Sequence, residues 1–324
     1  MNTKIKAGII GAAGYTGGEL IRILLHHSKV KIAFCYSRSQ HGKLVSDIHT
    51  DLFGDTDLKF TNEINPNIDV LFLCLPHGET KPFIENNSFS PTTKIIDLSN
   101  DFRLKKDAKD FIYGLPELNK NEIKNAKHIA NPGCFATTIQ LALLPLAKQN
   151  LLQSEIHISA ITGSTGAGVS LSETSHFTWR NNNASVYKAF THQHLGEITQ
   201  SIEQLQPSFN TTINFIPYRG DFTRGIIATI YVDFESEIDV AKAMYNRFYV
   251  DEKFVFISEK NIDIKQVVNT NKCLLYLEKQ GNKLMIISVI DNLIKGASGQ
   301  AVQNMNLIFG FEETEGLKLK SVAY

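Results

Sequence analysis

A strand-like run, a glycine-rich turn and a helix-like run follow one another directly near the start of the chain. The run IKAGIIGA is apolar over the length of a strand, whereas GGELIRILLHHS places its apolar residues at helical spacing. Gly11, Gly14 and Gly17 lie at the junction, where small residues permit a tight strand-to-helix turn. This order favours a parallel sheet that is covered by helices on its faces.

The alternation of strand and helix patterns continues through the first third of the chain and then stops. Strand-like runs recur at VKIAFCYS, IDVLFLCLP and TKIIDLS. After about residue 150, β-branched and aromatic runs dominate, and Gly281-Asn282 lies at the tip of a predicted hairpin. The sequence therefore predicts an α/β protein, in which an N-terminal Rossmann-like domain with a parallel sheet precedes an α+β domain with a mostly antiparallel sheet.

Composition excludes several classes of protein. The 324 residues include 33 basic and 33 acidic side chains, and no long basic run suggests a nucleic-acid or anionic membrane partner. The longest apolar runs are too short to span a bilayer, and the first residues lack a signal-peptide pattern. Four cysteines without a CxxC pair predict neither a disulfide framework nor a metal site. We therefore expect a cytoplasmic enzyme without metal.

The glycine-rich turn lies in the setting that a dinucleotide site requires. The helix that follows it offers free backbone N–H groups and a positive dipole end to a pyrophosphate. The spacing is GxxGxxG rather than GxGxxG, and the alternative is a tight turn that binds nothing. The predicted cofactor-binding residues of this turn are Gly11, Gly14, Tyr15, Thr16 and Gly17.

The end of the second strand indicates which dinucleotide binds. An NAD site usually has Asp or Glu there, which binds the ribose 2′-hydroxyl. This chain instead has Ser37, Arg38 and Ser39, with Lys43 close behind. Because arginine binds phosphate through two parallel hydrogen bonds, these residues suit the 2′-phosphate of NADP(H). The alternative is that Arg38 is a solvated loop residue.

One cysteine has a setting unlike the other three. Cys35, Cys74 and Cys273 lie in apolar runs and are predicted to be core residues. Cys134 follows a Pro-Gly pair and begins a helical pattern, so the helix dipole should favour its reactive thiolate. Pro145 is expected to kink or perturb this helix after its first two turns and to leave its start intact. The alternative for Cys134 is a small buried residue at a tight corner.

A histidine pair supplies the partner that a reactive thiol needs. The segment YKAFTHQHLGEI contains His192 and His194, and imidazole titrates near neutrality, as a proton shuttle must. The alternatives are surface histidines or half of a metal site. A metal site lacks a supporting cluster of further ligands in the sequence.

These motifs belong to a longer ordered set. It comprises GAAGYTGGEL, SRSQHGK, DLSNDFRL, NPGCFATT, TGSTGAG, HQHLGEI, TRGI and DNLIKGASGQAVQNMNL. Over nearly the whole chain, this set resembles the N-acetyl-γ-glutamyl-phosphate reductases, a family of the wider aspartate-semialdehyde dehydrogenase-like superfamily. The resemblance implies a cytoplasmic NADP(H)-dependent enzyme of arginine biosynthesis that forms a homodimer or homotetramer and reduces a small acyl phosphate through a cysteine thioester.

The resemblance also implies roles for residues at matching positions. Cys134 is the implied nucleophile, His192 the implied general acid/base, and His194 an implied helper on the substrate side. Which of the two histidines moves the proton stays open. Arg103 and Arg224 are implied to bind the substrate phosphate, and the alternative for each is a structural salt bridge.

A second glycine-rich segment completes the implied site. Gly163 and Gly166 of TGSTGAG are implied to line a loop beside the nicotinamide, and the alternative is a plain flexible loop. The implied NADP-binding domain comprises residues 1–135 and 300–324, where the final helix packs back. Residues 136–299 then form the catalytic, substrate-binding and oligomerisation domain.

Three departures from the family pattern concern the substrate. Gln193, Gly196 and Tyr218 replace the Arg, Pro and His that the family usually has there. The acyl group is therefore acetyl or succinyl, and an aminoadipyl- or aspartyl-phosphate reductase is an alternative. A non-catalytic NADP-sensing protein is a further alternative, although such a protein would need neither Cys134 nor His192.

Overall fold

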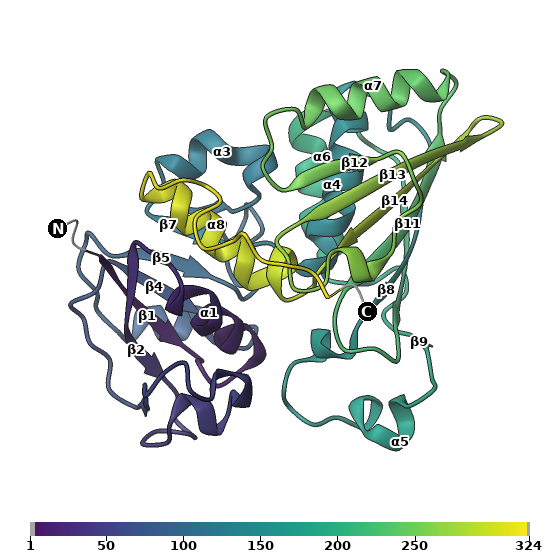
Figure 1. Ribbon diagram of the computed structural model, residues 1–324. Helices are drawn as coiled ribbons and strands as arrows, with labels where there is room; N and C mark the ends of the chain where they lie inside the picture. The colour runs from purple at the N-terminus through teal and green to yellow at the C-terminus, as the bar shows by residue number, and fades with distance from the viewer. Residues whose placement is uncertain (1–3, 323–324) are drawn as a thin grey trace. The chain divides into compact units, whose positions relative to one another are not determined.

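A computed structural model describes residues 4–322, which divide into two compact units (Figure 1). Of the described residues, the first unit comprises 4–132 and 297–318, and the second comprises 133–296 and 319–322. Cys134 thus lies at the start of the second unit, whereas the sequence analysis placed it at the end of the first domain. The last residues also group with the second unit, where Asn269 Nδ2 donates to the Lys320 carbonyl (3.0 Å).

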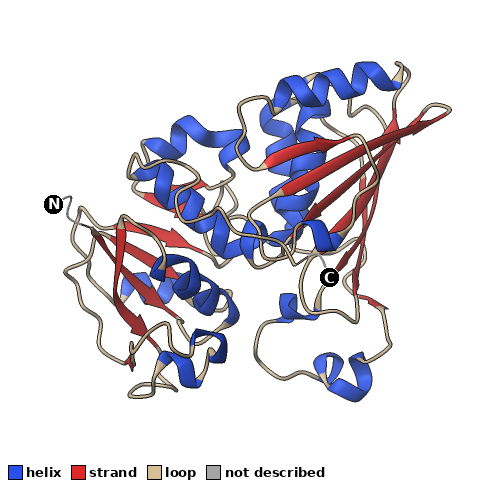
Figure 2. Cartoon of the chain, in the orientation of Figure 1, coloured by secondary structure: helices blue, strands red, loops and turns tan. Residues whose placement is uncertain are grey.

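The first unit contains a parallel sheet. Among its described residues, seven strands pair in the order β3-β2-β1-β4-β5-β7-β6, and every neighbouring pair is parallel. Figure 2 draws the strands in red and the helices in blue. The strands are β1 (Ile5–Ile10), β2 (Val30–Tyr36), β3 (Phe60–Thr61), β4 (Val70–Leu73), β5 (Lys94–Asp97), β6 (Phe111–Tyr113) and β7 (His128–Ala130). This confirms the predicted Rossmann-like sheet.

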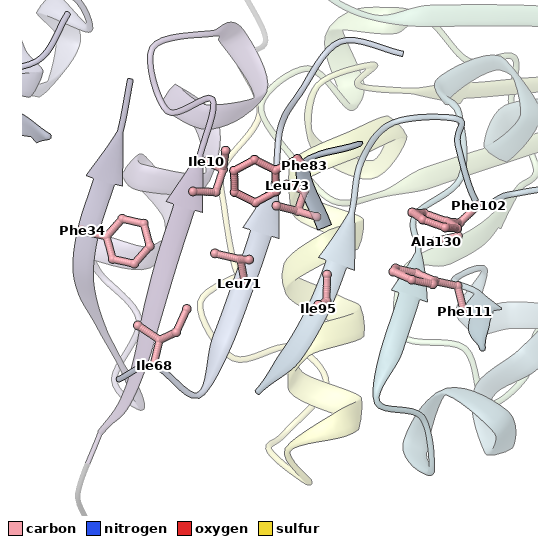
Figure 3. Packing of buried hydrophobic residues seen from close by; sticks show 10 residues of the cluster. All are labelled: Ile10, Phe34, Ile68, Leu71, Leu73, Phe83, Ile95, Phe102, Phe111 and Ala130. Atoms are coloured by element: carbon pink, nitrogen blue, oxygen red, sulfur yellow. The ribbon is translucent and has the colours of Figure 1, made fainter. Parts of the chain in front are cut away.

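Helices accompany this sheet, and apolar side chains fill the space between the layers. The helices are α1 (Tyr15–Leu25), α2 (Thr80–Glu85), α3 (Pro116–Lys124) and α8 (Gly299–Ile308), and α8 packs with α1 and α3. All four residues of β4 are buried, as expected for a central parallel strand that is covered on both faces. Figure 3 shows one core cluster, in which the rings of Phe102 and Phe111 stack with centroids 4.1 Å apart.

The second unit contains a mixed sheet. Its described strands pair in the order β12-β13-β14-β11-β8-β10-β9, and only β12–β13 and β8–β10 are parallel pairs. The strands are β8 (Ile156–Thr162), β9 (Ser185–Val186), β10 (Ile213–Arg219), β11 (Ile226–Asp233), β12 (Val255–Ser258), β13 (Cys273–Gln280) and β14 (Lys283–Ile290). This confirms the mostly antiparallel sheet, and Gly281 (φ +57°) supplies the left-handed residue at the predicted hairpin tip.

A buried helix is central to the second unit. Its helices are α4 (Cys134–Lys148), α5 (Phe177–Arg180), α6 (His194–Leu205) and α7 (Ile238–Phe248). All residues of α4 from Phe135 to Ala147 are buried, and α4 packs against β11, β14 and α6 (Figure 1). Short 3-10 turns cover Val45–Asp47, Thr50–Leu52, Ser164–Ala167, Glu173–Ser175 and Ile264–Gln266, and a π-helical turn covers Ile294–Ser298. Across residues 4–322, no helix combines the length and apolar character that crossing a membrane requires.

Pro145 was expected to kink or perturb the α4 helix, and the helix continues through it to Lys148 with one backbone hydrogen bond missing. Proline has no N–H to donate to the carbonyl four residues earlier, which is that of Leu141. The hydroxyl of Tyr249 donates to this carbonyl instead (2.5 Å), and the hydroxyl of Tyr245 donates to the next one (2.5 Å). The two buried tyrosine hydroxyls therefore donate hydrogen bonds to the helix carbonyls at the place where proline removes a backbone donor.

Candidate active site

Cys134 is the first residue of α4. The preceding Gly133 is the N-cap residue and provides no capping side chain, so the first turn of the helix keeps N–H groups beside the thiol. The thiol is half-buried, whereas Cys35 and Cys273 are buried, and burial raises the pKa of Cys35 to about 12. Cys74, also predicted to be a core residue, is half-buried. Among the four cysteines, Cys134 thus combines partial exposure with a helix N-terminus, the setting that activates thiolates.

Gly133 lets an imidazole pack directly on the backbone beside the cysteine. A Cβ at this position would lie 2.2 Å from Nε2 of His194, far inside van der Waals contact. The Gly133 N–H donates to Glu197 Oε2 (3.0 Å), and Glu197 Oε1 lies 3.9 Å from His194 Nε2. Glu197 and His194 are three residues apart on α6 and therefore share one face of that helix. One buried carboxylate thus holds both the imidazole and the backbone that leads into Cys134.

His192 lies in an aromatic pocket beside the cysteine's helix. Its ring meets Phe135, the residue after Cys134, at a centroid distance of 5.5 Å, and it meets Tyr187 at 5.7 Å and Phe215 at 5.5 Å. Burial, with the charge of Lys188 second, lowers the pKa of His192 to about 4. The imidazole is therefore neutral near neutral pH.

The proton of this neutral imidazole has a defined place. The backbone N–H of His194 points at Nδ1 of His192 (3.2 Å), so Nδ1 must accept and Nε2 carries the hydrogen. His192 and His194 lie side by side, with ring centroids 4.6 Å apart. No group of three or more His, Cys, Asp or Glu side chains that could hold a metal ion occurs within residues 4–322.

The segment after β14 also closes on the cysteine. A Cβ on Gly296 would lie 2.8 Å from Cβ of Cys134, so this glycine is needed for the π-helical turn to pass the thiol. The turn is anchored by buried Asp291, which accepts from the backbone N–H groups of Leu293 and Ile294 (2.8 and 3.0 Å). The DNLIKG part of the predicted motif therefore shapes the surroundings of Cys134.

Arg224 forms an ion pair with this same aspartate. Its Nε lies 3.1 Å from Oδ2 of Asp291, and its Nη2 lies 3.2 Å from Oδ1. Two parallel hydrogen bonds to a fully buried carboxylate hold the guanidinium in place. Of the two interpretations that the sequence left open for Arg224, these contacts favour the structural one.

Arg103 lies in the first unit and is 5% exposed. Its Nε donates to the carbonyl of Asn131 and its Nη2 to that of Leu98, both at 2.8 Å. These carbonyls follow the ends of β7 and β5, so the guanidinium ties two strand ends together. These contacts show that Arg103 has a structural role. The resemblance had implied that it binds the substrate phosphate.

In the first glycine-rich turn, the glycines let backbone segments approach each other closely. Gly11 has a left-handed φ of +75°, and a Cβ on it would lie 2.3 Å from the carbonyl oxygen of Cys74. Gly17 packs against Ala12, where a Cβ would lie 2.6 Å from Cα. Gly14 is the N-cap of α1 and provides no capping side chain, so Tyr15 and Thr16 begin the helix with free N–H groups. These residues fit a dinucleotide pyrophosphate.

The residues after β2 fit a phosphorylated ribose. Ser37 is buried, whereas Arg38 and Ser39 are exposed. The three directly follow Tyr36, the last residue of β2, and none is acidic. An exposed arginine is available at the position where an NAD site would have a carboxylate.

The second glycine-rich segment is firmly held. Gly163 N–H donates to Gly225 O (2.9 Å), and Ser164 N–H donates to Phe222 O (2.8 Å). A Cβ on Gly163 would lie 2.4 Å from the carbonyl oxygen of Thr223, whereas Gly166 has only ordinary contacts. These contacts argue against the flexible loop that the sequence left as an alternative.

The structure also brings in residues that the sequence analysis did not select: Gly133, Tyr187, Glu197, Arg219 and Gly296. The spacing of Glu197 from His194 is a signal that could have found it, because residues three apart share a helix face. Gly296 and Tyr187 lie inside quoted segments, DNLIKGASGQAVQNMNL and YKAFTHQHLGEI, but only the fold shows that they contact the site.

Comparisons with known proteins agree with this arrangement. The semialdehyde dehydrogenase NAD binding domain model matches residues 6–126, and the semialdehyde dehydrogenase dimerisation domain model matches residues 134–292. N-acetyl-gamma-glutamyl-phosphate reductases of Christiangramia forsetii and Flavobacterium johnsoniae are each 62% identical, covering 98% of this chain and 99% and 98% of theirs. The enzyme of Bacteroides thetaiotaomicron is 60% identical over 99% of this chain and all of its own. The chain belongs to the N-acetyl-γ-glutamyl-phosphate reductase family.

Solved structures share the fold of this reductase family at low identity. Aspartate semialdehyde dehydrogenase II of Vibrio cholerae, complexed with ASA, superposes with a TM-score of 0.75 at 16% identity, covering 95% of this chain and 99% of that one. The Candida albicans enzyme with NADP has a TM-score of 0.70 at 14% identity, covering 94% and 98%. These structures show the shared fold, and the two semialdehyde dehydrogenase domain models confirm the superfamily resemblance seen in the sequence.

Proposed function

We propose that this chain reduces an N-acyl-γ-glutamyl phosphate to the N-acyl-glutamate 5-semialdehyde and phosphate, with NADPH, in arginine biosynthesis. The observation that carries the proposal is a half-buried thiol at the uncapped N-terminus of α4, beside a buried neutral histidine. Relatives also support the proposal, because N-acetyl-gamma-glutamyl-phosphate reductases are about 60% identical to this chain over nearly its full length.

The first step is acyl transfer to sulfur. The Cys134 thiolate attacks the γ-carbonyl carbon, the bond from that carbon to the phosphate oxygen breaks, and inorganic phosphate leaves with the electron pair. The product is a thioester on Cys134, so one difficult reduction is divided into two easier steps. The N–H groups of the first turn of α4 stabilise both the thiolate and the negative charge that develops beside it.

The second step reduces the thioester. When bound, NADPH supplies the hydride. The Nε2–H of neutral His192 donates a hydrogen bond to the oxygen on which negative charge develops, and so stabilises that charge. In the resulting hemithioacetal anion, the oxygen re-forms the carbonyl as the carbon–sulfur bond breaks, which releases the semialdehyde and restores the thiolate without a net proton transfer. His194, held by Glu197, lines the substrate side of this centre.

NADP(H) fits the first unit. The backbone of Gly11, Gly14 and Gly17 permits close approach of a pyrophosphate, and Arg38 with Ser39 is exposed where a 2′-phosphate would bind. Gly163 and Gly166 are proposed to contact the nicotinamide half. The ion pair of Arg224 and the backbone contacts of Arg103 leave both as weaker candidates for the substrate phosphate.

The experiment runs the reaction in reverse. Purified protein, NADP and phosphate are mixed with N-acetyl-glutamate semialdehyde or its N-succinyl analogue, and NADPH absorbance is followed. Phosphate-dependent NADPH formation establishes the chemistry, and the faster semialdehyde identifies the acyl group. No turnover with either, from folded protein that binds NADPH, would redirect the assignment to the aspartyl or aminoadipyl substrates.

A matched variant separates an enzyme from a non-catalytic sensor. Cys134→Ser should abolish turnover while NADPH still raises the melting temperature. Cys273→Ser, at a buried cysteine outside the site, serves as the control and should keep turnover. Undiminished turnover in Cys134→Ser would contradict the thioester mechanism.

A further inference from the structure

Arg219 occupies an unusual position at the end of β10. It is the last residue of that strand and pairs in antiparallel register with Ser185 of β9. Its guanidinium lies over the ring of Tyr187, with Cζ 4.8 Å from the ring centroid. The strand pairing fixes the backbone of Arg219, and the cation–π contact holds its side chain against the Tyr187 ring.

No carboxylate neutralises this cation. Arg219 Nε is buried and has no hydrogen-bond partner within the described part of the chain, in contrast to Arg224 with its aspartate. Asp221 lies nearby, but its Oδ2 already accepts from the backbone N–H of Asn182 (2.6 Å). A guanidinium donor that is buried without an acceptor costs free energy until an acceptor binds.

A second guanidinium lies beside the first. Nη1 of Arg180 donates to the carbonyl of Arg219 (2.7 Å), while its Nε and Nη2 donate to the carbonyl of Thr174. Burial and the charge of Arg219 both lower the pKa of Arg180, and Asp221 opposes them. The two guanidinium groups and the single carboxylate of Asp221 leave a net positive charge. This positive potential favours the binding of an anion.

Tyr187 links Arg219 to the reacting groups. Burial raises the pKa of the Tyr187 hydroxyl and the charge of nearby Cys134 raises it further, whereas the charge of Arg219 and a side-chain hydrogen bond with Arg219 lower it. The Tyr187 ring also lies beside the imidazole of His192. Arg219 is therefore one side chain removed from the centre that handles the acyl group.

The backbone around Tyr187 is held in a strained form. Lys188 and Phe190 adopt left-handed φ values of +46° and +60°, which are uncommon for residues with side chains. Hydrogen bonds from Tyr187 N–H to Pro217 O (3.1 Å) and from Phe190 N–H to Phe215 O (2.9 Å) fix this segment along β10. Strain that the surroundings maintain is typical of binding sites.

We propose that Arg219, held by Tyr187, binds a carboxylate of the N-acyl-glutamyl substrate and thereby orients the γ-carbonyl at Cys134. This inference rests on the proposed function. The phosphate is bonded to the carbon that the thiol attacks, whereas Arg219 lies one side chain farther away and suits a more distant anion. Two carboxylates qualify by chemistry: the α-carboxylate, and a terminal carboxylate on the N-acyl group.

The test measures steady-state kinetics in the direction of NADPH formation. It compares wild type, Arg219→Gln, Arg219→Lys and the control Arg247→Gln, which changes an exposed arginine on α7. Loss of a charge-assisted hydrogen bond should raise KM for the semialdehyde about 10- to 100-fold in Arg219→Gln, with KM for phosphate and NADP changed less than about twofold. Arg219→Lys should recover part of the loss. The control should match wild type.

Two substrate pairs distinguish the carboxylates. If the α-carboxylate binds, wild type prefers N-acetyl-glutamate semialdehyde to its α-amide and Arg219→Gln loses that preference. If the acyl carboxylate binds, the variant instead loses a preference for the N-succinyl over the N-acetyl substrate. Either loss of preference supports the proposal.

Other outcomes overturn it. An unchanged KM, an equal loss with every substrate, or a rise confined to KM for phosphate would each show that Arg219 binds no substrate carboxylate. If Arg219→Gln fails to fold, judged by its thermal unfolding, Arg219→Lys serves the same comparison because it keeps the charge without the bidentate geometry. Absence of turnover in wild type would contradict the proposed function itself.

Discussion

The candidate site depends on individual residues whose size or burial sets the chemistry of their neighbours. Gly133 has no side chain, so the imidazole of His194 lies against the backbone just before Cys134. His192 is buried, so it is a neutral donor where an exposed histidine would be partly charged. The missing Cβ of Gly133 lets the imidazole of His194 approach the backbone, and the burial of His192 keeps its imidazole neutral.

Adding one methyl group at Gly133 should therefore disrupt the site. Because its Cβ would lie 2.2 Å from His194 Nε2, Gly133→Ala should lower the free energy of unfolding by about 1–3 kcal/mol and abolish most activity. Removing the imidazole removes the clash, so Gly133→Ala with His194→Ala should be less destabilised than the two single changes added together. Denaturant unfolding of the four proteins measures this coupling, and strict additivity would contradict the contact.

Acid should destabilise the fold through His192. Its pKa is lowered from 6.5 to about 4, so as pH falls the unfolded state takes up the proton first. The stability that His192 contributes is complete above its unfolded pKa and is lost as pH falls toward about 4, on the order of 2 kcal/mol between about pH 7 and about pH 5. Urea unfolding at the two pH values measures this slope. His192→Asn should flatten it, and an unchanged slope would exclude His192 as the cause.

At the scale of elements, α4 presents the nucleophile and α7 supports α4. Pro145 leaves the carbonyl of Leu141 without its helical donor, and the hydroxyl of Tyr249 replaces it. The helix therefore continues although one backbone hydrogen bond is missing near its C-terminal end. Cys134 stays at a regular helix N-terminus.

Removing the Tyr249 hydroxyl should lower the free energy of unfolding, although the change removes only one oxygen atom. Tyr249→Phe leaves a buried carbonyl unsatisfied, so the free energy of unfolding should fall by about 1–3 kcal/mol. Tyr231→Phe, at a tyrosine that is 41% exposed, is the matched control and should change stability by less than about 0.5 kcal/mol. Thermal or denaturant unfolding compares the two, and equal effects would show that the bond to Leu141 contributes nothing.

At the scale of the whole molecule, the second unit is expected to pair with another copy of the chain. Residues 134–292 match a dimerisation domain model, and within that range Leu171 and Phe177 are 95% and 74% exposed. Large apolar side chains at such exposure are typical of interaction surfaces. We expect light scattering to give two or four times the mass of one chain at micromolar concentration, and a single-chain mass there would contradict self-association.

Features that follow from neighbouring residues could be predicted from the sequence. Periodicity predicted both sheets, the Pro-Gly pair predicted that a helix starts at Cys134, and the glycine spacing predicted the turn after β1. Each depends on backbone preferences within a few residues, so no tertiary information was needed.

Features that need distant residues could not be predicted in this way. The sequence left Arg224 open between substrate and salt bridge, because its partner Asp291 lies in a separate strand connection. It did not select Arg219, because the role of this residue depends on Tyr187 from another strand end and on an Nε that has no hydrogen-bond partner within residues 4–322. Domain boundaries likewise shifted by a few residues, since they depend on packing.

The sequence by itself determined the fold class, the family and the candidate nucleophile, because these are carried by local periodicity and by ordered motifs. Only the tertiary structure decided that His192 is neutral with its proton on Nε2, that Arg224 is held by a buried carboxylate, and that Arg219 is not. The physical reason is that burial and charge pairing are properties of the space around a side chain, which the fold alone defines.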